Sequence, residues 1–268
     1  MPILNLGDTD LYYEVAGSGP AFVFNSATAW HGEPWKLYQV PEFSKDHTVI
    51  TYDQRGTGKS TTRSGDFSTT RLAADVVALL DHLKIKKTIV LGHSNGGRIA
   101  VALATDFPDL VSKLILASSG TTYNGAPGVP IKMCAELVRN GYEKYTLDHV
   151  HAVGFTKTYY EANKEVCDKF IAVRMSNLPS LESFLGYVVN RQESDTSSKL
   201  KNIDVPTLIM IGEDEDHHAT GLTHLQSAKL LAKEIAGAKY VMLPGQGHHY
   251  PFVAPEMTNK VIREFLSG

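Results

Sequence analysis

A serine in a glycine-rich turn is the residue whose surroundings most clearly suggest chemistry. Residues 92–97, GHSNGG, follow a short apolar run and precede a run with helical spacing. In that context G-x-S-x-G places the hydroxyl of Ser94 on a sharp strand-to-helix turn, where small neighbours leave it open to a carbonyl carbon. The N–H of Asn95 would then lie at a helix N-terminus and stabilise a developing oxyanion. An inert serine in a glycine-rich turn is the alternative, which the flanking strand and helix disfavour.

A histidine near the end of the chain is the candidate base. His248 lies in residues 244–249, PGQGHH, after an apolar run and before the last helical pattern. Imidazole has an unperturbed pKa near 6.5, so it can accept the serine proton and return it to the leaving group. Its neighbour His249 is interpreted as a solvated loop side chain. The acidic residues 213–216, EDED, lie between serine and histidine, which gives the chain order Ser, acid, His.

The elements that must position these residues follow from the apolar pattern. Helical patterns at residues 72–83, 98–107 and 257–265 alternate with short β-branched runs. This alternation predicts a mostly parallel sheet with helices on both faces, preceded by an antiparallel hairpin at residues 3–15. The runs predicted to form buried strands are residues 21–24, 48–52, 88–91, 114–117, 207–211 and 240–243.

The alternation of strands and helices stops after Ser119. Residues 121–201 have helical patterns and many aromatic side chains but no clear strand, and a Val-Pro pair at 205–206 restarts the sheet. We therefore predict a core made of residues 1–120 and 202–268, with residues 121–201 inserted as a helical cap.

Composition and charge exclude several classes of function. The 268 residues are 43% hydrophobic and 21% charged, with a net charge of -3 and no block of Lys and Arg, so a nucleic acid is not an expected partner. No stretch approaches 18 apolar residues and no signal-peptide pattern is present, so we expect a cytoplasmic protein without a membrane partner. Cys134 and Cys167 lack metal-site or disulfide-framework spacing.

A metal site at the acidic stretch is an alternative interpretation, because His217, His218 and His224 follow it. Adjacent histidines point in different directions in most backbones, and charged loop residues are usually solvated. We therefore expect no metal and no cofactor. The expected partner is a small-molecule substrate, and the expected state is a monomer or a homodimer.

These motifs together resemble the α/β-hydrolase superfamily, in its single-cap branch of esterases, lactonases and C–C bond hydrolases. The resemblance covers nearly the whole chain, and it implies the α/β-hydrolase fold with a mostly parallel twisted sheet, flanking helices and a helical cap. Residues 53–60 are interpreted as bracing the loop beside the nucleophile. The segments that carry the resemblance are residues 53–60 (DQRGTGKS), 92–97, 205–212 (VPTLIMIG), 247–248 (GH) and 255–256 (PE).

The resemblance also implies the remaining members of the site. Family members carry His-Gly after the third strand and use the next N–H as an oxyanion donor; here residues 24–27 are FNSA, so Ala27 would donate, after a serine in place of the glycine. The family's acid, three residues after the strand's glycine, falls on Glu215. Because aspartate is the commoner acid, a one-residue shift would select Asp214 or Asp216, and the three remain open.

The expected function is a serine hydrolase that cleaves a small or medium apolar ester or lactone through an acyl-enzyme. Ser94 attacks, His248 takes the proton, a carboxylate orients the imidazole, and the N–H groups of Asn95 and Ala27 hold the oxyanion. The aromatic, weakly charged cap favours an apolar substrate. Amide or C–C bond hydrolysis on the same triad, and a ligand-binding receptor with little turnover, are the alternatives.

Overall fold

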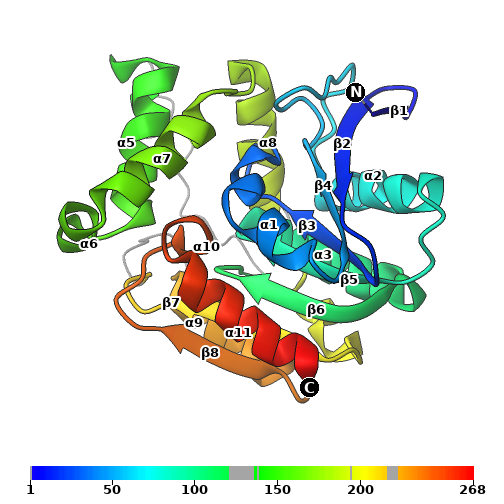
Figure 1. Ribbon diagram of the computed structural model, residues 1–268. Helices are drawn as coiled ribbons and strands as arrows, with labels where there is room; N and C mark the ends of the chain where they lie inside the picture. The colour runs from blue at the N-terminus through cyan, green and yellow to red at the C-terminus, as the bar shows by residue number, and fades with distance from the viewer. Residues whose placement is uncertain (1, 121–135, 138, 194, 216–222) are drawn as a thin grey trace.

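An eight-stranded, mostly parallel sheet forms the centre of the protein (Figure 1). The computed structural model describes residues 2–120, 136–137, 139–193, 195–215 and 223–268. The strand order is β1-β2-β4-β3-β5-β6-β7-β8, and only the β1–β2 and β2–β4 pairs are antiparallel. The strands are β1 (Ile3–Asn5), β2 (Asp10–Ala16), β3 (Ala21–Asn25), β4 (Thr48–Tyr52), β5 (Thr88–His93), β6 (Val111–Ala117), β7 (Thr207–Gly212) and β8 (Lys239–Leu243).

Each predicted strand forms, and the opening hairpin is antiparallel as predicted. The prediction was least accurate at the start of β6, which begins at Val111, three residues before the predicted run. The reason is that Ser112 and Lys113 are only half-buried, so this part of the strand lacks an apolar signature.

Helices cover both faces of the sheet, and alternate strand residues supply the two cores. Phe22 and Phe24 of β3 pack with Phe43 in one apolar cluster, whereas Val23 packs with Val76 in the other. Burying each such side chain contributes about 1.5–3 kcal/mol. The flanking helices are α2 (Thr69–His82), α3 (Asn95–Asp106) and α9 (His224–Glu234) on the valine side, and α1 (Gln39–Phe43) and α11 (Pro255–Ser267) on the phenylalanine side.

The described part of the insertion between β6 and β7 includes the helices α5 (Tyr142–Gly154), α6 (Lys157–Ala162), α7 (Lys164–Met175) and α8 (Leu181–Glu193). Helix α7 packs against the 3-10 helix η1 (Glu33–Leu37) and against α10 (Tyr250–Val253), so the insertion rests on two loops of the core (Figure 1). The predicted cap limits remain a prediction, because residues 121–135 at its start lie outside the described residues.

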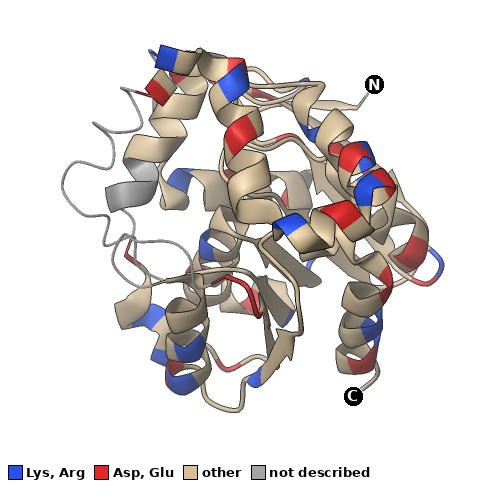
Figure 2. Ribbon diagram, turned by 90° about the vertical axis from the view of Figure 1, so that its left-hand side faces the viewer, with Lys and Arg blue, Asp and Glu red and all other residues tan. Residues whose placement is uncertain are grey.

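The surface carries both signs of charge interspersed along the helices (Figure 2). None of the described helices is long and apolar enough to cross a membrane. Cys167 is buried as a free thiol, and burial raises its pKa to about 11, whereas Cys134 lies outside the described residues.

Candidate active site

Ser94 stands between the last residue of β5 and the first residue of α3, on the predicted strand-to-helix turn. Its φ of 55° and ψ of -119° fall in a region that residues with a side chain rarely adopt, so neighbouring contacts must hold it there. The Ser94 N–H donates to the carbonyl of Ala117 at 2.9 Å. A Cβ on Gly96 would overlap the carbonyl oxygen of Asn25, which explains why the turn needs glycine.

The structure brings Glu215, of the three candidate acids, to the predicted base. His248 Nδ1 lies 2.7 Å from Glu215 Oε2. The carboxylate is fully buried, and its Oε1 accepts hydrogen bonds from Ser118 Oγ at 2.6 Å and from the Gly212 N–H at 2.8 Å. These neutral donors, together with the His248 ring, stabilise the buried carboxylate. The acid, the base and the strand ends β6 and β7 therefore form one connected network.

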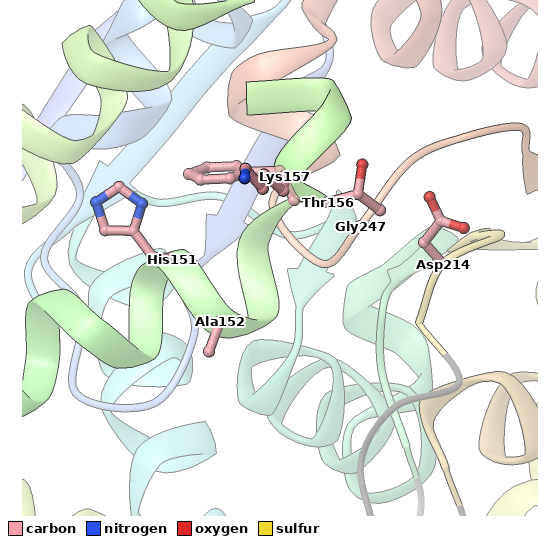
Figure 3. A pocket seen from close by; sticks show the side chains of 7 residues that line it. His151, Ala152, Thr156, Lys157, Asp214 and Gly247 are labelled. Carbon is pink, nitrogen blue, oxygen red and sulfur yellow. The ribbon is translucent and has the colours of Figure 1, made fainter. Parts of the chain in front are cut away.

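The other two candidate acids are placed differently. Asp214 lines a pocket of about 390 Å³ between α5, α6 and the loops that follow β7 and β8. Figure 3 shows its carboxylate across this pocket from the cap helix that carries His151 and Ala152. Asp216 lies outside the described residues, as do His217 and His218.

The interpretation of His249 as a solvated side chain was wrong. Its side chain is buried, with ring contacts to Trp30 at 5.2 Å and Phe170 at 5.1 Å. The cause is the cap, because the N–H groups of His248 and His249 donate to the carbonyls of Val153 and Gly154 at the end of α5. Burial lowers the pKa of His249 well below its usual value, so the ring is neutral at pH 7.

His93, next to the nucleophile, fixes the backbone of the base. Its Nε2 lies 2.8 Å from the carbonyl oxygen of His248, and its ring is fully buried. Burial lowers the pKa of His93 to about 3, so this ring is also neutral and its Nε2–H donates to the carbonyl. The residue before the serine thus ties the nucleophile turn to the histidine loop.

The two predicted oxyanion donors lie on facing segments. Asn95 is the first residue of α3, where an N–H has no acceptor within the helix. Ala27 is buried in the loop after β3, and its N–H donates to none of the described residues. Close packing of Gly96 against Asn25 and Ser26 holds this loop beside the nucleophile turn.

The polar side chains of the loop after β3 support its backbone. Ser26 Oγ accepts from Trp35 Nε1 at 2.9 Å and donates to the His31 carbonyl at 3.2 Å. Asn25 donates to the Leu91 carbonyl at 3.0 Å. The serine that replaces the family's glycine therefore anchors the loop.

Residues 53–60 brace the same loop, in agreement with their interpretation. Asp53 accepts hydrogen bonds from the N–H groups of Gly32 at 2.7 Å and Lys59 at 2.8 Å. Gln54 Nε2 donates to the Ser26 carbonyl at 2.7 Å. Burial raises the pKa of Asp53. The contacts are with backbone groups, which accounts for the conformation of the loop.

His224 lies beside the site, although the sequence suggests it only as a candidate metal ligand. Its Nδ1 lies 3.9 Å from Glu215 Oε2, and its ring centroid lies 4.5 Å from that of His248. His224 is the first residue of α9, whose N-terminus has a capping box formed by Thr223 and Gln226. Donor atoms of Glu215, His224 and His248 lie within 4.8 Å of one another, but a cation there would compete with the Glu215–His248 hydrogen bond.

Comparisons with known proteins agree with this architecture. The family model described as the alpha/beta hydrolase fold matches residues 20–162. The chain belongs to the α/β-hydrolase family. The predicted fold class is thereby confirmed.

Relatives of the chain within this family have different activities in their names. A putative carbamate hydrolase, RutD, from Azorhizobium caulinodans is 26% identical over 99% of this chain and 98% of its own length. A non-heme haloperoxidase from Rhodococcus erythropolis is 24% identical over the full length of both chains. The crystal structure of the enol-lactonase from Burkholderia xenovorans matches all of both chains with a TM-score of 0.87 and 27% identity.

Proposed function

We propose that this member of the α/β-hydrolase family is a serine hydrolase that cleaves an ester or a lactone through an acyl-enzyme on Ser94. The observation that carries the proposal is the 2.7 Å contact between His248 Nδ1 and the buried Glu215 carboxylate, on loops beside the nucleophile turn. A carboxylate at Nδ1 selects the tautomer whose Nε2 is unprotonated and can accept the serine proton.

The proposed reaction has two halves. In the first, Ser94 Oγ attacks the carbonyl carbon as its proton passes to His248 Nε2, and the oxyanion accepts hydrogen bonds from the N–H groups of Asn95 and Ala27. The leaving oxygen takes the proton from His248, and the acyl group stays on the serine. In the second half, water attacks the acyl carbon as its proton passes to His248, and Ser94 Oγ leaves with that proton as the acid is released. A lactone differs only in that its leaving oxygen remains tethered to the acyl group.

The residues that surround the proposed site favour an acyl group of small or medium size. Trp30, Phe170 and Phe252 contact one another between α7, α10 and the loop after β3, where they form a buried aromatic cluster. The similarity to an enol-lactonase is consistent with a lactone or ester carbonyl as the target. Because one relative is named a haloperoxidase, experiments must first establish which type of reaction this site catalyses.

The test combines active-site labelling with turnover. An alkyl fluorophosphonate should attach to Ser94 alone, as located by peptide mass spectrometry, and Ser94→Ala should remove both the label and the hydrolysis of a panel of short esters and γ-lactones. Steady turnover is expected. A single stoichiometric burst without turnover would instead support a ligand-binding receptor, and label on Ser26 or Ser60 would contradict the assignment of the nucleophile.

A further inference from the structure

Arg174 of α7 is a buried cation that pairs with no carboxylate among the described residues. Its residue is 2% exposed, and neither Nε nor Nη1 has a hydrogen-bond partner. No ion pair among the described side chains includes it. A buried guanidinium is normally paired, because desolvating its charge is costly. An unpaired one therefore requires a functional explanation.

The guanidinium lies over a ring that contacts residues beside the proposed nucleophile and base. Its central carbon is 4.8 Å from the ring centroid of Trp30, on the loop that carries Ala27. The same indole contacts the ring of His93 at 5.7 Å and that of His249 at 5.2 Å, the residues beside the proposed nucleophile and base. Contacts of α7 with η1 and α10 hold the helix against this part of the core (Figure 1).

The described groups around Arg174 supply no negative charge that would compensate it. Burial lowers the pKa of Arg174 to about 10, so the side chain remains protonated at pH 7. Burial and then the charge of Arg174 lower the pKa of His31 to about 4, and His249 is neutral as well. A bound anion would therefore supply a charge that the described neighbours lack.

We propose that Arg174 binds a free carboxylate of the substrate, so that the preferred substrates are esters or lactones whose acyl portion ends in a carboxylate. This inference rests on the proposed hydrolase function and specifies its substrate class. The guanidinium lies over the Trp30 ring, and its Nε and Nη1 have N–H groups that a ligand can use. A carboxylate matches the planar fork with two parallel hydrogen bonds. The aromatic walls would then hold the methylene chain between the carboxylate and the scissile carbonyl.

The experiment compares two esters of the same shape. Monomethyl glutarate carries the carboxylate, and methyl 5-methylhexanoate replaces it with an isopropyl group. The ratio of kcat/KM for the anionic ester to that for the neutral ester is measured by chromatography for the wild type, Arg174→Met and Lys169→Met. Lys169 is the matched control, because it is an exposed cation on the same helix. We expect the ratio to fall at least 30-fold in Arg174→Met and less than twofold in Lys169→Met.

Two further measurements separate this inference from a structural role and from the proposed reaction. Removing an uncompensated buried charge should leave the Tm equal or raise it, so equal losses on both esters with a lower Tm would overturn the inference. So would a change in the ratio below threefold. If the wild type hydrolyses neither ester, the reaction is wrong, and calorimetry with the glutarate dianion still decides: at least tenfold weaker binding to Arg174→Met supports the anion site, and equal binding overturns it.

Discussion

The core and the cap each bury one charge near the proposed site, and the two charges are treated in opposite ways. Glu215 in the core is in hydrogen-bond contact with His248, Ser118 and the Gly212 backbone. Arg174 in the cap has two donor nitrogens without a partner. A buried group with all its partners is already oriented before a ligand arrives, whereas one that lacks partners is stabilised when a ligand provides them. The difference supports the two proposals, that the core performs the chemistry and that the cap recognises the substrate.

The largest effect should follow from removing the nucleophile of the core. Ser94→Ala is expected to lower kcat by at least about 10³-fold, because it removes the atom that forms the acyl-enzyme. Its Tm should stay near the wild-type value, since the serine hydroxyl is not needed for the turn. Steady-state kinetics on a short ester and a thermal melt check this, and residual activity within tenfold of wild type would break the assignment of chemistry to the core.

The acid should give the next largest effect, with its own neighbour as the control. Glu215→Gln keeps the size of the side chain but removes the charge that stabilises the His248 imidazolium, so kcat should fall about 10³- to 10⁴-fold. Asp214→Asn should stay within about threefold, because the contact at His248 Nδ1 is made by Glu215, whereas Asp214 lines a pocket with cap residues. Measuring kcat of the two variants side by side tests which residue is the acid. Equal losses in both variants, or a loss in Asp214→Asn alone, would show that the geometry misidentifies the acid.

The sequence predicted the elements of the core well because their signals are local. The nucleophile turn lies in residues 92–97, directly after a strand with a continuous apolar run. The histidine follows the last strand directly. The choice of Glu215 over Asp214 needed a structure, since consecutive side chains diverge and a one-residue difference in loop length is invisible in a run of acids. Chain order alone left three alternatives.

The sequence could not predict the contacts between cap and core. His249, His224 and Arg174 come close to the site only through packing of α5, α7 and α9, which no spacing in the sequence reports. A loop histidine is usually exposed, which predicts a solvated His249, but packing of the cap buries it here. These three residues differ from Ser94 and His248 in having no motif of their own.

A smaller effect is expected from the loop that joins core and cap. Ser26→Ala would leave Trp35 Nε1 without its acceptor and the His31 carbonyl without the serine donor. Each buried group left unpaired costs about 1–3 kcal/mol, so the free energy of unfolding should fall by a similar amount. Because this loop carries Ala27, kcat should fall about three- to tenfold. Urea unfolding and ester kinetics measure both, and a change in neither would show that Ser26 does not anchor the loop.

The smallest effect concerns the histidines buried where cap and core meet, and it depends on pH. His93 has a pKa lowered to about 3 by burial, and burial lowers the pKa of His249 well below its usual value. Below the unfolded pKa of about 6.5 the unfolded chain binds protons that these rings in the folded protein do not. Stability is therefore full above pH 6.5, and each ring makes it fall by about 1.4 kcal/mol per pH unit as the pH drops toward the folded pKa.

The variant His249→Phe measures how much of this pH dependence of stability comes from one ring. Both ring nitrogens of His249 lack a hydrogen-bond partner, and Trp30 and Phe170 surround the ring with aromatic surface. Phenylalanine should therefore raise the free energy of unfolding at pH 7.5 by about 1 kcal/mol, and by more at pH 5.5 because no proton uptake opposes folding at this position. His82→Phe is the control on an exposed helix position. Urea unfolding at the two pH values measures the difference. An equal gain at both pH values would mean that the pKa of His249 is not lowered in the folded protein. Water would then reach the contact between core and cap.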